Sequence, residues 1–159
     1  MENLFAWPLM LTLLVVLGLV IMLALTCIGS AIGVSIAGNA LVGGLKKNPD
    51  MFGKALILCA LPSTQGLYGF AAFFLFLLKL ATMSSLTYMQ AILMFVTGAS
   101  LGVAGYFSAT YQAKLVCNGI VEMSNSRDVF TQTMVLAVFP ELYAILTFAS
   151  AFLVWIFAL

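Results

Sequence analysis

Four long stretches of this chain carry almost no charge, and they constrain its fold more than any other feature. They span Asn3–Leu45, Ala55–Leu78, Leu80–Ala113 and Val129–Leu159, and only the last contains a charged residue, Glu141. A helix needs about 20 mostly apolar residues to cross the hydrocarbon core, because it rises 1.5 Å per residue. Each stretch can therefore cross a membrane once, and the first and third are long enough to project beyond it.

The composition supports a membrane protein. Of the 159 residues, 64% are hydrophobic and 7% are charged, and no soluble domain of this length could bury so much apolar surface. The formal charge of +1 provides no basic patch, so nucleic-acid binding is not expected. The sequence predicts an all-α membrane protein.

Metal-binding and processing signals are few. Histidine is absent, which removes the commonest metal ligand and pH switch. The cysteines, Cys27, Cys59 and Cys117, form no CxxC pair, and we expect buried free thiols rather than a zinc or redox site. The residues before the first apolar run contain Glu2 and no positive charge, so we expect no cleavable signal peptide.

Short connections separate the four stretches. Lys46–Asp50 is a turn that contains a proline, Lys79–Ser85 is a tight, weakly polar turn, and Asn118–Asp128 is predicted to be a polar loop. The result is four helices in up-down order, arranged as a first hairpin over 1–81 and a second over 82–159. The expected spans are about 9–45, 53–79, 86–117 and 129–158.

The positive charges predict the orientation. Five of the six flank the first and third loops, whereas Lys79 lies at the opposite end. The five are Lys46, Lys47, Lys54, Lys114 and Arg127. Because cytoplasmic loops carry an excess of Lys and Arg, we expect both hairpin loops in the cytoplasm. The chain would be a multi-pass protein of the cell membrane with both termini outside.

The two halves of the chain resemble each other. The glycine motif at Gly29–Gly33 recurs at Gly98–Gly102, 69 residues later, and Pro62 recurs as Pro140, 78 residues later. The difference predicts a nine-residue insertion before the second loop. Each half is expected to be one hairpin, with a glycine-rich first helix and a proline-kinked second helix, duplicated in parallel orientation.

The glycine pairs Gly29/Gly33 and Gly98/Gly102 have the GxxxG spacing that lets membrane helices approach closely. Two interpretations are open. The glycines can serve ordinary packing within one chain, or they can form the crowded inner wall of a ring of several copies.

Glu141 is the most informative single residue. A charge near the middle of a membrane span costs roughly 2.5–3.5 kcal/mol on insertion scales and marks a functional site by default. Counting from the loops places Gln112, Gln65 and Glu141 within about one helical turn of the same depth. On neighbouring helices these side chains could meet.

The residues near this depth are rich in oxygen. Gln65 and Gln112 offer amide carbonyls, Thr64 a hydroxyl and Glu141 a carboxylate, and hard cations such as Na⁺ favour such ligands. Pro62 and Pro140 leave backbone carbonyls of the preceding turn free as further ligands. Tyr68 lies four residues after Thr64, on the same helix face, where its hydroxyl could hold the carboxylate.

These residues also carry a family resemblance. The segments Ala55–Leu58, Leu61–Phe70 and Glu141–Leu146, together with the duplicated hairpin, resemble the proteolipid (K or c) subunit of the rotor ring of bacterial V-type ATPases. The resemblance is greatest to the sodium-translocating type, and it covers nearly the whole chain. Two departures are Pro140, which is typical of the smaller F-type proteolipids, and Ser63, which adds a hydroxyl beside Thr64.

The resemblance implies a site, a function and partners. One Na⁺ per subunit would be bound by the residues Leu61 (backbone carbonyl), Thr64, Gln65, Gln112 and Glu141, with Tyr68 as hydrogen-bond partner of the carboxylate. Copies would form a ring that turns against a stator subunit with an arginine, and the cytoplasmic loops would dock on the central stalk. The chain itself would be non-catalytic and need no organic cofactor, and it has no phosphate-binding motif.

Three alternatives remain open at this point. The same rotor subunit could carry H⁺, although a protonated carboxyl does not need Gln65, Thr64 or Gln112. A small cation transporter or channel would use Glu141 without needing the glycine stripes. A purely structural four-helix protein would leave Glu141 unexplained.

Overall fold

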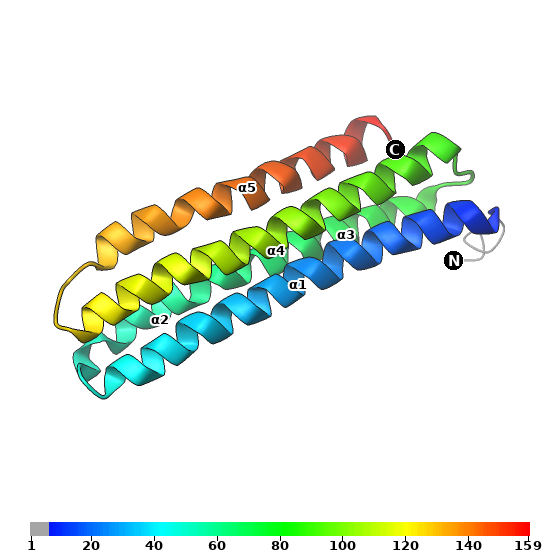
Figure 1. Ribbon diagram of the computed structural model, residues 1–159. Coiled ribbons are helices and arrows are strands. Elements are labelled where there is room, and N and C mark those ends of the chain that lie inside the picture. The colour runs from blue at the N-terminus through cyan, green and yellow to red at the C-terminus, as the bar shows by residue number, and fades with distance from the viewer. Residues whose placement is uncertain (1–6) are drawn as a thin grey trace.

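The structure, a computed structural model, describes residues 7–159, and every regular element in that range is a helix (Figure 1). The elements are α1 (Leu9–Leu45), η2 (Pro49–Met51), α2 (Phe52–Ala60), η3 (Leu61–Ser63), α3 (Thr64–Thr82), α4 (Tyr88–Ser124) and α5 (Phe130–Phe157). Four helical spans, with η2 to α3 forming one of them, are long and apolar enough to cross a membrane. The predicted four-helix membrane architecture is confirmed. The residues on which the signal-peptide expectation depends lie outside the described range.

The helices form two hairpins that lie side by side (Figure 1). The span from η2 to α3 runs back along α1, and α5 runs back along α4. The start of α1 and the end of α5 lie at one end of the bundle, and the α1–η2 and α4–α5 loops lie at the other. The most extensive contact joins α1 to α4, which run parallel.

The glycines allow this α1–α4 contact to be unusually close. A Cβ on Gly29 would lie 2.6 Å from the Cα of Tyr106, and one on Gly98 would overlap the backbone of Gly18. Gly33 and Gly102 face the backbone of the opposite helix in the same way. All four predicted glycines therefore serve packing within the chain, which was one of the two interpretations open from the sequence.

The alignment of the two glycine motifs was wrong. Helices α1 and α4 both contain 37 residues and begin at Leu9 and Tyr88. Gly29 lies 20 residues into its helix, whereas Gly98 lies only 10 residues into its own and beside Gly18. The hairpins therefore match at the larger offset throughout, and no nine-residue insertion is needed. The GxxxG pattern misled because helix contacts reuse it at several depths.

The loop predicted over Asn118–Asp128 is mostly helix, because α4 continues to Ser124. The helix ends in a Schellman motif. The backbone N–H of Arg127 donates to the Glu122 carbonyl at 3.2 Å, that of Ser126 donates to the Met123 carbonyl at 3.0 Å, and Ser126 has a φ of 63°. Polar residues at the end of α4 are thus compatible with a helix that extends beyond the apolar layer.

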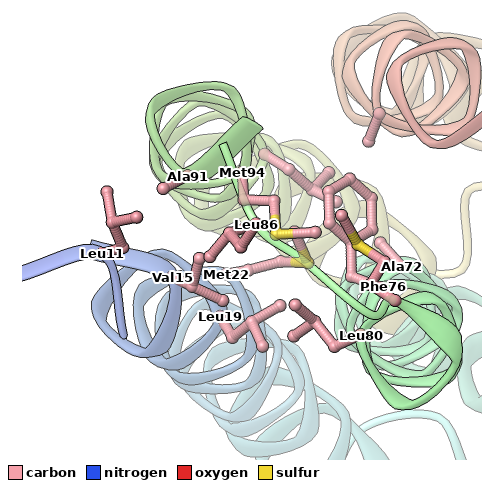
Figure 2. Close-up of a cluster of buried hydrophobic side chains, with 13 residues drawn as sticks. Leu11, Val15, Leu19, Met22, Ala72, Phe76, Leu80, Leu86, Ala91 and Met94 are labelled. Carbon is pink, nitrogen blue, oxygen red and sulfur yellow. The ribbon is translucent and has the colours of Figure 1, made fainter. Parts of the chain in front are cut away.

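Two apolar clusters fill the interior. One lies toward the chain termini around Met22, Phe76 and Met94 (Figure 2), and the other lies toward the loops around Leu58 and Ile120. The polar residues near Glu141 fall between these two clusters along the helices, so apolar packing closes the site above and below.

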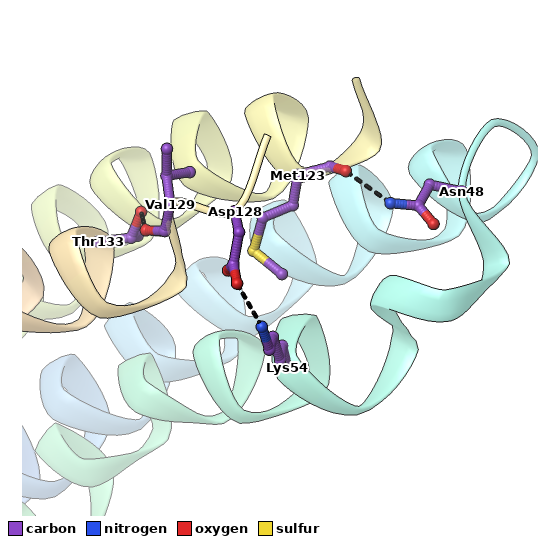
Figure 3. A network of polar contacts seen from close by, with 6 residues as sticks. All are labelled: Asn48, Lys54, Met123, Asp128, Val129 and Thr133. Carbon is purple, nitrogen blue, oxygen red and sulfur yellow. Dashed lines mark hydrogen bonds and ion pairs between the residues drawn. The ribbon is translucent and has the colours of Figure 1, made fainter. Parts of the chain in front are cut away.

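Polar contacts tie the two hairpins together at the loop end (Figure 3). Lys54 Nζ lies 2.7 Å from Asp128 Oδ2, and the side-chain amide of Asn48 donates to the Met123 carbonyl at 2.9 Å. Both contacts connect the first hairpin to the end of α4 or the loop after it, and so they hold the two loops in one register.

The three cysteines are free, but they are not uniformly buried as expected. Cys59 is buried, Cys117 is half-buried and Cys27 is exposed on the surface of α1. An apolar run predicts membrane burial, but within the membrane a thiol can still face outward from its own chain.

Candidate ion-binding site

A single turn of 3-10 helix shapes the first side of the site. Pro62 lacks an N–H, and the span tightens at Leu61–Ser63 before continuing as α3. This turn brings the Thr64 hydroxyl to 3.0 Å from the Leu61 carbonyl oxygen. Pro62 itself is buried against Gly33 of α1. The proline therefore sets up a local pair of oxygen atoms next to α5.

Three donors converge on the Glu141 carboxylate. The hydroxyls of Thr64 and Tyr68 each lie 2.8 Å from its Oε1, and the side-chain amide of Gln112 donates to Oε2 at 3.1 Å. These side chains come from three separate helices, α3, α4 and α5. The structure thus brings together residues that are up to 77 positions apart in the chain.

Gln65 lies one layer behind the carboxylate. Its side-chain amide donates to Gln112 Oε1 and to Ser108 Oγ, both at 3.0 Å. Gln65 reaches Glu141 only through Gln112, although the sequence placed both amides equally close to it. Gln112 also donates to the Ala137 carbonyl at 2.9 Å, which fixes its position against α5.

Ser108 belongs to this network, although it was not expected from the sequence. Its hydroxyl donates to the Pro140 carbonyl at 2.8 Å and accepts from Gln65. Ser108 and Gln112 are four residues apart, so they share one face of α4. That spacing in an otherwise apolar helix was the signal that could have identified it.

The other polar neighbour singled out from the sequence lies elsewhere. The exposed Ser63 hydroxyl donates to the Ala60 carbonyl of its own helix at 2.6 Å, and so it adds nothing to the site. Pro140 lies inside a continuous α5 and contributes through its carbonyl, which holds Ser108.

The site is closed on its inner side and partly open on its outer side. Gln65 and Gln112 are completely buried and Ser108 is 5% exposed. Glu141, Thr64 and Tyr68 are half-buried at the seam between α3 and α5. The Tyr68 ring stacks on Phe148 at 5.8 Å between centroids, which covers the carboxylate toward the chain termini. The carboxylate is therefore reachable only from the outer surface of the hairpin pair.

One buried oxygen in the site has no partner. Gln65 Oε1 is inaccessible and accepts no hydrogen bond within residues 7–159, and such an orphaned acceptor costs about 1–3 kcal/mol. Oxygens of Leu61, Thr64 and Glu141 lie close to one another in the same layer. This donor set fits a hard cation, and a single carboxylate matches one positive charge. Among the described residues no group of three or more acidic, Cys or His side chains forms a multivalent metal site.

Comparison with known proteins identifies the family. The family of the ATP synthase C subunits matches residues 17–76 and again residues 95–154. The chain belongs to this family. The two matches confirm the duplicated hairpin, and their bounds differ by 78 residues at both ends, as the helices do.

Two curated relatives narrow the family assignment. V-type sodium ATPase subunit K of Enterococcus hirae is 40% identical over 128 residues, which cover 79% of this chain and 80% of the relative. A-type ATP synthase subunit K of Methanocaldococcus jannaschii is 36% identical over 118 residues, which cover 74% of this chain and 50% of that relative. The chain is therefore a non-catalytic membrane proteolipid of the V/A-type ATPase group, and the resemblance inferred from its motifs is confirmed.

Proposed function

We propose that this proteolipid carries one Na⁺ per chain at Glu141 in the rotor ring of a V-type ATPase. The observation that supports the ion most directly is the arrangement around the carboxylate. Three donors hold it in its acceptor-only, ionised form, while the buried Gln65 Oε1 still needs a positive partner. A cation satisfies both requirements at once. The name of the E. hirae relative, a sodium ATPase subunit, favours Na⁺ as that cation.

The Na⁺ ligands in this proposal are the Leu61 carbonyl, the Thr64 hydroxyl, the Glu141 carboxylate and the side-chain oxygens of Gln65 and Gln112. Gln112 now directs its nitrogen toward Glu141. A half-turn of that amide would direct its oxygen to the ion instead. Tyr68 keeps its hydrogen bond to the carboxylate and does not need to contact the ion.

Ion occupancy would control rotation through the cost of burying charge. A bare carboxylate facing lipid is expensive, whereas a neutral Glu141–Na⁺ pair with its ligands satisfied is not. Because Glu141 lies on the outer side of the chain, it is within reach of a stator subunit beside the ring. An arginine on that subunit would release the ion by replacing its charge, and the ring would turn only as each carboxylate is reloaded.

The remaining parts of the proposal concern placement. Both loops at the α1–η2 and α4–α5 turns lie at one end of the bundle and carry most of the positive charge, which favours a cytoplasmic position and contact with the central stalk. The ends of the chain would then face the outside of the cell membrane. ATP would be hydrolysed or made on other subunits.

Labelling of buried carboxyls with a carbodiimide tests the ion. At constant pH, Na⁺ is expected to protect Glu141 from modification in the membrane-embedded protein, since the bound ion excludes the protonated form that reacts. K⁺ at equal ionic strength is the control for salt, and Glu141→Gln is the control for the labelled position. Protection by raised pH alone, with no effect of Na⁺, would establish H⁺ as the transported ion and reject the proposal.

A further inference from the structure

The second hairpin exposes a groove along its whole length, on the side away from the first hairpin. Three depressions of about 470, 360 and 250 Å³ lie between α4 and α5. The largest, here called the α4–α5 groove, is lined chiefly by the side chains of Phe107, Tyr111, Leu115, Leu136, Phe139 and Tyr143. Most of these are large and exposed, Tyr143 by 67%.

The internal repeat indicates what belongs in this groove. Subtracting 78 from each lining position gives Gly29, Gly33, Ala37, Leu58, Leu61 and Gln65 in the first hairpin. Five of these are buried and Leu61 is half-buried. They are covered by the second hairpin: Gly29 meets Tyr106 of α4, and Gln65 meets Gln112. The face that is covered in the first hairpin is thus exposed in the second.

The opposite side of the molecule shows the converse. The α4 positions Gly98, Gly102 and Ala109 lie against α1. Their equivalents on α1, Val20, Ala24 and Ala31, are exposed or half-exposed. The face that is covered in the second hairpin is therefore exposed in the first.

We propose that the α4–α5 groove receives the first hairpin of a second copy of this chain, in the register that the first hairpin takes against the second within one chain. Such a contact joins two different faces, so it can repeat from copy to copy and close into a ring. It rests on the ring of the proposed function and adds which surfaces meet and at which residues.

Charges at the loop end are complementary in this register. A Cβ on Gly44 would lie 3.0 Å from Ser124 Cβ, and the equivalent positions are Glu122 of one copy and Lys46 of the next. Opposite charges therefore come together. Glu122 is already paired with Arg127 of its own chain at 2.7 Å, so Lys46 would complete a three-charge cluster.

A second polar pair follows from the same rule. The ion pair between Lys54 and Asp128 corresponds to Gln132 of one copy and Asp50 of the next. The amide of Gln132 can donate to that carboxylate. Neither pair was needed to define the register, so their agreement in chemistry is independent support.

Side-chain sizes also fit. The large Tyr111 of the groove corresponds to Gly33, which lies against Ala109 and Ala113. In the next copy it would therefore meet Ala31 and Ser35, which are both exposed. Gly38 follows on that helix, and a Cβ there meets nothing within 4 Å. Small residues with free space on α1 are thus matched to large residues without partners on α4.

Disulfide cross-linking tests the register in the intact membrane protein. A Cβ on Gly33 would lie 3.4 Å from Ala113 Cβ, which is close to the spacing a disulfide needs. The equivalent pair between copies is Tyr111 and Ser35. In a background without Cys27, Cys59 and Cys117, the variant Ser35→Cys/Tyr111→Cys is expected to give, on oxidation, a ladder of dimers, trimers and larger species.

A second pair and a matched control make the test specific. Lys46→Cys/Glu122→Cys should give the same ladder at the aqueous end. Ser35→Cys/Val138→Cys should not, because Val138 and its equivalent Ala60 are both exposed and so are expected to face lipid. Absence of a ladder from both test pairs, or products that stop at dimers, would overturn the proposal.

Carbodiimide labelling of the same samples separates the two proposals. Missing ladders with Na⁺-protected Glu141 would reject the contact and leave the ion site intact. Ladders with no protection by Na⁺ would support the contact and reject the ion.

Discussion

The Tyr68 hydroxyl donates to Oε1 of Glu141 at 2.8 Å while its ring stacks on Phe148. The two interactions have different roles. The hydroxyl holds the carboxylate in one orientation, and the stacked ring covers it on the side of the chain termini. Replacing the hydroxyl alone should therefore affect ion binding without disturbing the packing.

We predict that Tyr68→Phe lowers the affinity for Na⁺ about tenfold. A hydrogen bond to a charged group contributes about 1.5–3 kcal/mol, and 1.4 kcal/mol corresponds to a factor of ten. The lower end applies because Thr64 and Gln112 still hold the carboxylate. The measurement is the Na⁺ concentration that protects half of Glu141 from carbodiimide. An unchanged concentration would show that the Tyr68 hydroxyl does not position the carboxylate.

Ser108→Ala should weaken Na⁺ binding severalfold although Ser108 does not touch Glu141. The variant removes the acceptor for the Gln65 amide and the donor to the Pro140 carbonyl, so both Gln65 and the turn before Glu141 lose a fixed position. Ser63→Ala is the matched control, since that hydroxyl bonds only within its own helix. Equal effects of the two variants on Na⁺ protection would contradict this role for Ser108.

The sequence was sufficient for the span count and for most of the site, because charges mark loops and an isolated Glu141 marks a buried function. Counting residues along helices put Gln112 at the right depth. It could not tell that Gln65 contacts Gln112 rather than Glu141, since depth along a helix says nothing about rotation around it. For the same reason Ser108 was missed, and the match of Gly29 to Gly98 was wrong.

The α1–α4 contact makes a prediction about stability. Gly98→Ala should destabilise the protein by about 1–3 kcal/mol, because the new methyl group would overlap the Gly18 backbone and force the helices apart. Gly53→Ala is the control, since a Cβ there meets nothing within 4 Å. Thermal unfolding in detergent should separate the two variants, with Gly53→Ala equal to or above the parent. A Gly98→Ala protein as stable as the parent would exclude the close approach.

The pair between Lys54 and Asp128 predicts a pH dependence at the loop end. The hydrogen bond from Lys54, and then its charge, lower the pKa of the Asp128 carboxyl below its usual value of 3.8. Because this pKa is lower in the folded state, the pair stabilises the fold above the unfolded pKa and loses its effect as pH falls through the folded one. Both side chains are exposed, so the effect on unfolding is expected to be small. In Lys54→Met, Asp128 should titrate at a higher pH than in the parent, as followed by carbon NMR of its carboxyl. Lys47→Met, which removes a lysine that makes no ion pair within residues 7–159, should leave the titration unchanged. The same midpoint in all three proteins would show that Lys54 does not hold Asp128 in solution.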